Sequence, residues 1–155
     1  HGLDVQIVVH PVWERGIGSS IAAGVAALQR RDERAHRRAG AGGCAADAVL
    51  ITLADQPLVG PEALRRLLTA RRDAGKAIAA SRYAGTAGVP ACFERALLPA
   101  LLALDGATGC KPLLRAHADD TVLVDCPEAA QDVDTPADFA RLLASPIHVA
   151  HTTTG

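Results

Sequence analysis

The chain has 155 residues, of which 49% are hydrophobic, and a formal net charge of −1. This length and composition predict one globular domain and exclude a disordered chain. The near-zero charge argues against a broad nucleic-acid footprint or a membrane-binding basic patch, and no apolar run is long enough to span a membrane.

The four cysteines are far apart in sequence and form no CxxC pair. They are Cys44, Cys92, Cys110 and Cys126. A structural zinc site usually needs such close ligand pairs, and the histidines are equally scattered, so no zinc site is expected. Together with the absence of a visible signal peptide, this favours reduced thiols in a cytoplasmic protein.

The chain begins with His1 and enters β-prone residues 4–9 (DVQIVV) almost at once, which predicts a first strand. Such a start is typical of a piece cut from a longer protein. A loop with Pro and Gly follows over residues 10–20 (HPVWERGIGSS), and Ser19 or Ser20 can cap the next helix. A glycine-rich loop at a helix N-terminus suits a phosphate or a nucleobase edge, and an ordinary capped helix is the alternative.

Residues 30–47 are charged and then rich in Gly and Ala, which predicts a surface connection. Residues 49–53 (VLITL) form a short apolar run without helical periodicity, which predicts a strand buried on both faces. Asp55 follows this strand and Pro57 stops it. Open α/β sheets present ligand groups at such strand ends. The alternative is a plain turn in which Asp55 bonds nearby backbone amides.

The rest of the chain alternates between strand and helix. Strands are expected at 76–81, 121–126 and 131–134, and a glycine-rich loop at 82–90. Helices are expected from Gly60-Pro61, over 94–104, over 112–117 and from Thr135-Pro136. This order predicts an α/β fold with a mostly parallel sheet and helices on both faces.

Carboxylates lie at the ends of two predicted strands. Asp55 ends the central one, and Asp132 and Asp134 point to the same side of an extended chain. Oxygen ligands of this kind suit Mg²⁺ together with substrate phosphates. The alternative is that Asp132 is structural and Asp134 only caps the last helix. No Cys or His nucleophile has a plausible partner set, so phosphoryl or nucleotidyl transfer fits better than covalent catalysis.

Five motifs occur in one order: VVHPVWERGIGSSI, LADQPLV, YAGTAGVPACF, GATGCKPLL and DVDTPADF. In this order they resemble the MobA/MocA-like nucleotidyltransferase family, and most closely its molybdenum cofactor cytidylyltransferase branch. The resemblance covers roughly residues 5–143 and implies a Rossmann-like three-layer sandwich. It implies a nucleotidyltransferase domain over residues 1–144, followed by a flexible tail over 145–155.

The resemblance also implies the reaction. A Mg²⁺-dependent enzyme would move CMP from CTP onto the phosphate of molybdopterin and release pyrophosphate. The implied partners are CTP or another nucleoside triphosphate, a molybdopterin-type acceptor and a molybdenum hydroxylase, with no nucleic acid and no membrane.

The implied site residues fall into three groups. Asp55 and Asp134 would be the catalytic metal ligands. Gly16, Gly18, Ser19 and Ser20 would line the nucleotide. Gly88, Pro90 and Lys111 would lie on the acceptor side.

The chain departs from the family pattern in three ways. The family's opening strand, glycine-rich phosphate loop and lysine have no counterpart here, His10 replaces an Asn, and Ile17 replaces a Met. We therefore expect a sheet without its N-terminal strand and a chain that is impaired or inactive on its own. A related enzyme with a different phosphorylated acceptor, or a non-catalytic remnant that binds a cofactor, are the alternatives.

Overall fold

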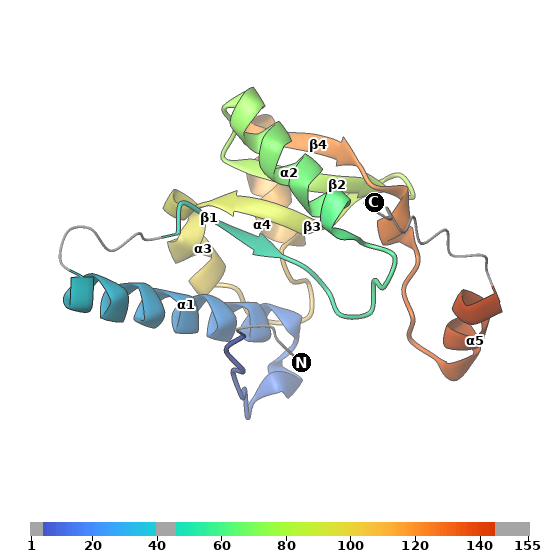
Figure 1. The fold of residues 1–155 in the computed structure, drawn as a ribbon, viewed down its shortest axis with the longest axis horizontal. Coiled ribbons are helices and arrows are strands. Elements are labelled where there is room, and N and C mark those ends of the chain that lie inside the picture. Colours follow the sequence, from blue (N-terminus) through green and yellow to red (C-terminus); the bar gives the residue numbers. More distant parts are fainter. Residues whose placement is uncertain (1–4, 40–45, 145–155) are drawn as a thin grey trace, which may run out of the picture.

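The computed structural model describes residues 5–39 and 46–144. Within them, four strands form one sheet in the order β1-β3-β2-β4 (Figure 1). The strands are β1 (Ala48–Ile51), β2 (Ile78–Tyr83), β3 (Thr86–Glu94) and β4 (Thr121–Asp125). β2 pairs with β4 in parallel, whereas β3 is antiparallel to both β1 and β2. β1, β2 and β4 therefore run in one direction, which confirms a mostly parallel α/β sheet.

Strand β3 corrects the prediction of a glycine-rich loop over residues 82–90. Tyr83 pairs with Thr86, so only two residues make the turn between β2 and β3. These residues, Ala84 and Gly85, have positive φ values of 47° and 75°. Tight turns with positive φ match the twist of a β-hairpin. The glycines of this stretch predicted a loop, but residues 86–88 pair with β2. The same strand continues to Glu94, and residues 91–94 also pair with β1, so β3 is a central strand.

A bulge explains how proline fits into this central strand. Ala80 pairs with Ala91 and Ser81 pairs with Gly88, which leaves Val89 and Pro90 unpaired between them. Proline cannot donate a backbone hydrogen bond, so within sheets it is tolerated at edges and bulges. The hydroxyl of the buried Ser81 donates to the Pro90 carbonyl at 2.7 Å, which stabilises the bulge.

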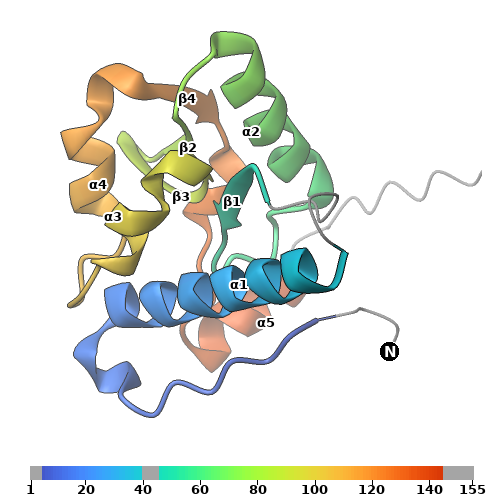
Figure 2. The same cartoon turned by 90° about the vertical axis from the view of Figure 1, so that its left-hand side faces the viewer.

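Helices cover both faces of the sheet (Figure 2). α2 (Pro61–Ala74) packs on one face, and α1 (Ile17–Ala39), α3 (Leu98–Leu102) and α4 (Lys111–Ala116) lie on the other. This three-layer arrangement confirms the predicted fold class. α5 (Pro136–Ala144) follows beyond the edge of the sheet (Figure 1).

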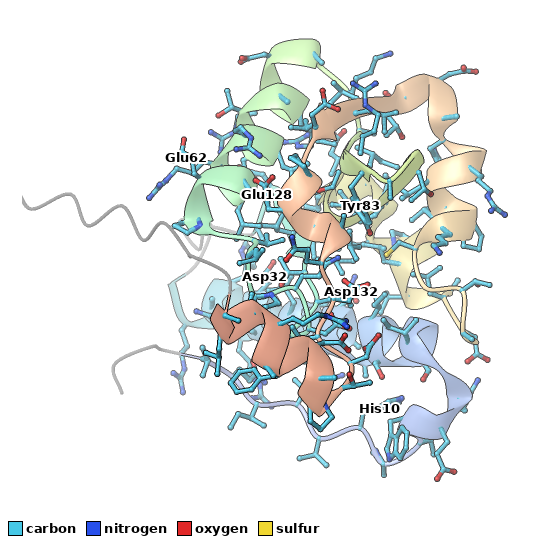
Figure 3. The ribbon with its side chains drawn as sticks, turned by 90° about the vertical axis from the view of Figure 1, so that its right-hand side faces the viewer. His10, Asp32, Glu62, Tyr83, Glu128 and Asp132 are labelled. Carbon is cyan, nitrogen blue, oxygen red and sulfur yellow. The ribbon has the colours of Figure 1, made fainter. Side chains whose placement is uncertain are left out.

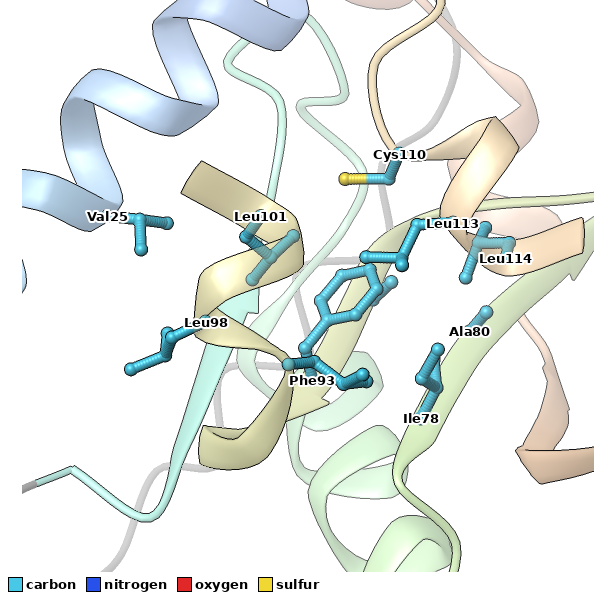
Figure 4. Packing of buried hydrophobic residues seen from close by; sticks show 11 residues of the cluster. Val25, Ile78, Ala80, Phe93, Leu98, Leu101, Cys110, Leu113 and Leu114 are labelled. Carbon is cyan, nitrogen blue, oxygen red and sulfur yellow. The ribbon is translucent and has the colours of Figure 1, made fainter. Parts of the chain in front are cut away.

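The larger core cluster lies between the sheet and the helices α1, α3 and α4 (Figure 4). Phe93 and Ile78 from the sheet and Leu101 from α3 are fully buried there. Alternate residues of the same strands, Ala79 and Cys92, face α2 instead. The two-residue period of a strand thus supplies both cores.

Residues 49–53 were predicted to form a strand buried on both faces, and strand β1 is less buried than this prediction. Val49 and Ile51 pack against the larger cluster, and Ala48 and Leu50 pack on the α2 side, but all four residues of β1 are only half-buried. The reason is that β1 is an edge strand of the described sheet.

Two predictions near the N-terminus are also corrected. Residues 5–9 form no strand: they pair with none of the described strands, and Ile7 and Val9 are each 85% exposed. Residues 30–39, predicted as a surface connection, continue helix α1. Asp32 stabilises the helix position by accepting a hydrogen bond from Arg95 at 3.0 Å. Residues 40–45 lie outside the described part of the chain.

The predicted strand over residues 131–134 is absent as well. This segment is extended, but it contributes a single backbone bond, from Val133 N–H to the Asp55 carbonyl at 2.8 Å. One bond does not make a strand. The predicted tail, residues 145–155, lies outside the described residues.

Three of the cysteines, Cys92, Cys110 and Cys126, are buried free thiols, as predicted, and Cys44 lies outside the described residues. No helix in the described ranges is long and apolar enough to cross a membrane.

Replacing Phe93 by Ala should lower the free energy of unfolding by about 3–5 kcal/mol, because the ring fills the centre of the larger core. Urea unfolding of the purified chain measures the change. Phe139→Ala is the matched control, because Phe139 is 53% exposed and its truncation should change stability by less than about 0.5 kcal/mol. Equal losses in both variants would contradict this description of the core.

Candidate active site

The candidate site lies where three strands of one direction end. Asp55 follows β1, Tyr83 is the last residue of β2, and Asp132 lies in the segment after β4. The carboxyl ends of codirectional strands meet at one edge of a sheet, which is where open α/β sheets bind ligands. Figure 3 shows Tyr83 and Asp132 in the middle of this side of the molecule.

A cavity of 420 Å³ opens at this edge. Its walls come from the start of α1, the ends of β1 and β2, the bulge of β3, the turn before α4 and the segment after β4. The lining residues that carry the following argument are Ile17, Gln56, Tyr83, Gly88, Lys111 and Asp132. The wall is mostly apolar, with one cation and one carboxylate, as in many small-molecule sites.

Asp55 has an unpaired oxygen. The residue is half-buried, and its Oδ1 atom is buried without a hydrogen-bond donor among the described residues. An unsatisfied buried polar atom costs about 1–3 kcal/mol, and more if it is charged. A divalent cation with a preference for oxygen ligands would satisfy this atom. Asp55 is not among the residues that line the 420 Å³ cavity, so the unpaired oxygen suits a cation chemically but the role of Asp55 as a metal ligand stays a prediction.

Gln56 was not among the residues predicted from sequence. Its side chain is only 4% exposed, and its Nε2–H group donates to the Ala129 carbonyl at 2.9 Å. This bond ties the turn after β1 to the segment after β4. It also fixes the orientation of the amide, because a flipped amide would place its oxygen against the carbonyl. The one signal in the sequence was its position inside the LADQP motif.

Tyr83 was also missed. Burial raises the pKa of its hydroxyl above the ordinary value of 10.0, nearby Gln56 lowers it, and the negative charges of Asp132 and Asp55 raise it. The hydroxyl stays protonated at neutral pH. The contribution of neutral Tyr83 to stability is therefore complete below about pH 10 and is lost as the pH rises through the folded-state pKa.

Gly88 has no side chain, and this leaves room for the hydroxyl of Tyr83 beside it. A Cβ atom at position 88 would lie 2.6 Å from the tyrosine hydroxyl, so any other residue there would force the ring of Tyr83 to shift. Of the predicted acceptor-side residues, Gly88 and Lys111 line the cavity. Pro90 is fully buried behind it and does not line it.

Cys110 also lines the cavity, but burial raises the pKa of its thiol to about 11. The thiol is therefore neutral at physiological pH and poorly suited to act as a nucleophile. This agrees with the inference from sequence that covalent catalysis by cysteine is not used.

The predicted nucleotide loop is held by close packing. Gly18 N–H donates to the Gly106 carbonyl at 3.0 Å, and a Cβ at Gly16 or Gly18 would lie 2.4 Å or 2.8 Å from the backbone of residues 105–106. Both glycines are therefore needed for the approach of two backbones. They pack the loop against the turn that precedes α4.

The predicted helix cap is corrected here. Helix α1 begins at Ile17, so Ser19 lies inside its first turn. The Ser19 hydroxyl donates to the Gly16 carbonyl at 2.7 Å and accepts from His10 Nε2 at 3.0 Å. Ser20 instead lines a groove of 680 Å³ between α1 and β1, which adjoins the 420 Å³ cavity at Ile17, Ile21, Ile51 and Leu53. The structure thus separates the two serines that the sequence grouped together.

Asp134 does not line the 420 Å³ cavity, whereas Asp132 does. Asp134 is exposed and precedes the cap of α5, where Thr135 and Asp138 bond each other's backbone N–H groups. This reciprocal pair is a capping box, formed by Thr135 and Asp138 and not by Asp134. The predicted pairing of Asp134 with Asp55 on a metal stays a prediction.

The fold and this edge define an α/β protein with a small-molecule site at the carboxyl ends of its strands. The profile of the MobA-like NTP transferase domain matches residues 1–122. The chain belongs to this family.

Relatives agree with this assignment. The chain is 29% identical over 148 residues to nicotine blue oxidoreductase of Paenarthrobacter nicotinovorans, an alignment that covers 89% of this chain and 64% of that protein. The chain thus spans less than two thirds of that relative's length.

Solved structures give the same fold. Rv0371c of Mycobacterium tuberculosis H37Rv, solved in complex with manganese, is 29% identical with a TM-score of 0.62 over 94% of this chain and 70% of that chain. The Rv0371c homologue from Mycobacterium sp. strain JC1 is 25% identical with a TM-score of 0.60, over 81% of this chain and 56% of that chain.

The single tyrosine of the chain permits a direct test of the site. We expect Tyr83 to titrate above 10.0 and Asp132→Asn to lower its pKa, because that change removes a negative charge beside the ring. Absorbance of tyrosinate measures both values. Asp134→Asn is the matched control and should leave the pKa unchanged. An equal shift in the control would contradict the assignment, because it would show that Asp132 has no special place beside the ring.

Proposed function

We propose that the protein is a cytoplasmic, Mg²⁺-dependent nucleotidyltransferase that moves CMP from CTP onto the phosphate of a molybdopterin-type acceptor. The observation that carries the proposal is the unpaired Asp55 oxygen at the carboxyl edge of the sheet, in a protein of the NTP transferase family. A molybdenum hydroxylase is the proposed recipient of the product.

The reaction needs no covalent enzyme intermediate. An oxygen of the acceptor phosphate forms a bond to the α-phosphorus of CTP, and the bond from that phosphorus to the bridging oxygen breaks. Pyrophosphate leaves with the electron pair. Transfers of this kind depend on positioning and on stabilising charge.

A divalent cation held by Asp55, with Asp134 as the proposed second ligand, would neutralise charge on the triphosphate. The manganese complex of Rv0371c supports a divalent cation in this family. Lys111 lines the cavity and would offer its positive charge to the acceptor phosphate. Gly16, Gly18, Ser19 and Ser20 would shape the nucleotide side of the site, and Gly88 and Pro90 the acceptor side.

A second candidate function is suggested by the relative named nicotine blue oxidoreductase. The cavity has apolar walls, among them Ile51, Leu53 and Val89, which would suit an aromatic pigment. Loss of the colour of nicotine blue in the presence of a reduced nicotinamide dinucleotide tests this reading. Release of pyrophosphate from CTP tests the first candidate function, nucleotidyl transfer.

Asp55→Asn should lower metal-dependent nucleotidyl transfer by about 100-fold or more and should abolish Mn²⁺ binding. The free energy of unfolding without metal should stay the same or rise, because an unpaired buried charge is removed. The exposed Asp73→Asn is the matched control. Retained Mn²⁺ binding in Asp55→Asn would overturn the metal-ligand assignment.

The two serines of the loop should differ in their effects. Ser20→Ala should raise the nucleotide KM with little change in kcat, because the loop would bind ground and transition states equally. Ser19→Ala should lower the free energy of unfolding by about 1 kcal/mol, because two hydrogen bonds of a buried hydroxyl are lost. Kinetics and urea unfolding of both variants check this. A Ser20→Ala protein that fails to fold would contradict the assignment.

A further inference from the structure

A second hollow, of 270 Å³, adjoins the 420 Å³ cavity. Lys111 and Leu114 line both, so the two spaces are joined along helix α4. Beyond Lys111, the second hollow is walled by Arg115 of α4, by the start of β3 at Thr86 and by β4 at Thr121. A molecule held in the cavity can therefore extend past Lys111 into this hollow.

The hollow carries positive charge that no described residue neutralises. Lys111 and Arg115 are four residues apart on α4, which places their Cβ atoms about 5–6 Å apart on one face of the helix. Neither side chain forms a hydrogen bond or an ion pair with a described residue, and no carboxylate lines the hollow.

Two other arginines, one on β2 and one on α2, behave differently. Arg82 makes two bonds to Asp125, at 2.7 and 3.0 Å, and Arg66 bonds Glu128 at 2.6 Å. Their charges are neutralised within the protein. Arg115 has no such carboxylate among the described residues, although its guanidinium has the fork geometry that binds carboxylate or phosphate in two places.

The 420 Å³ cavity and the second hollow also differ in the charges of the residues that line them. The cavity contains Asp132 as well as Lys111, whereas the second hollow contains Lys111 and Arg115 with small and apolar neighbours such as Ala118. Positive charge therefore increases along α4 away from the strand ends. An elongated ligand whose phosphate lies near Lys111 would be oriented with a second anionic group at Arg115.

We propose that Arg115 forms a second anion subsite, so that the acceptor carries a second anionic group beyond the phosphate held near Lys111. The class of acceptor is a phosphate ester with a carboxylate or another anion a few bonds away. This inference rests on the proposed function for the role of the ligand as acceptor, but the subsite itself is tested by binding alone.

Two small probes separate the subsites. Glycerol 3-phosphate and 3-phosphoglycerate differ only in a hydroxymethyl group against a carboxylate. Titration of the whole chain, followed by NMR, gives the Kd of each. We expect 3-phosphoglycerate to bind about three- to fivefold more tightly, since a partly exposed ion pair contributes about that ratio.

Substitutions then show which residue causes the difference between the two Kd values. Arg115→Gln should reduce the ratio of the two Kd values to about one while leaving glycerol 3-phosphate almost unchanged. Lys111→Gln should weaken both probes. Arg72→Gln is the matched control, because Arg72 is exposed on α2 and pairs with no described carboxylate. It should change neither value.

The proposal is overturned if the unmodified chain does not distinguish the probes, if it binds neither, or if Arg72→Gln acts like Arg115→Gln. Nucleotidyl transfer from CTP is assayed separately. A chain that distinguishes the probes retains the subsite even if it transfers no nucleotide, because a chain that is impaired on its own is expected to transfer little. Transfer without discrimination would refute the subsite and leave the proposed function.

Discussion

The hydrogen bonds between the turn after β1 and the segment after β4 hold the candidate site together. Val133 N–H reaches the Asp55 carbonyl, and the Gln56 amide reaches the Ala129 carbonyl. These strands are at opposite ends of the sheet order, with β3 and β2 between them. Without the two bonds, Asp55 and Asp132 would belong to separate loops. Backbone and amide groups, not ionic pairing, fix the distance between these two segments, and Asp132 lines the 420 Å³ cavity beside Gln56.

The hairpin of β2 and β3 supplies the opposite wall. Because β3 runs against its neighbours, it begins at the edge where they end, and so brings Gly88 beside Tyr83. A sheet with only parallel strands would have no strand start at that edge. The one antiparallel strand therefore explains how a glycine, a tyrosine and a bulge contribute to a site that codirectional strands otherwise build.

Several helix starts and the strand that leads into the candidate site were predictable from short stretches of sequence. Pro61 and Thr135-Pro136 marked helix starts, and the apolar run ending at Asp55 marked the strand that leads into the site. What failed depends on partners distant in sequence. Residues 82–90 look like a loop although residues 86–88 pair with β2, and residues 5–9 look like a strand although no described strand pairs with them. Gln56 and Tyr83 gain their importance only from neighbours at positions 129 and 88.

The two-residue turn at Ala84 and Gly85 has a consequence for variation within such folds. It lies at the end of β2, beside the cavity, while the register of β2 with β3 and β4 is fixed by the strands behind it. Insertions at this turn would lengthen the wall of the cavity without changing a single core contact. The shape of the cavity can therefore diverge by changes in length at one solvent-exposed turn, separately from the stability of the sheet that supports it.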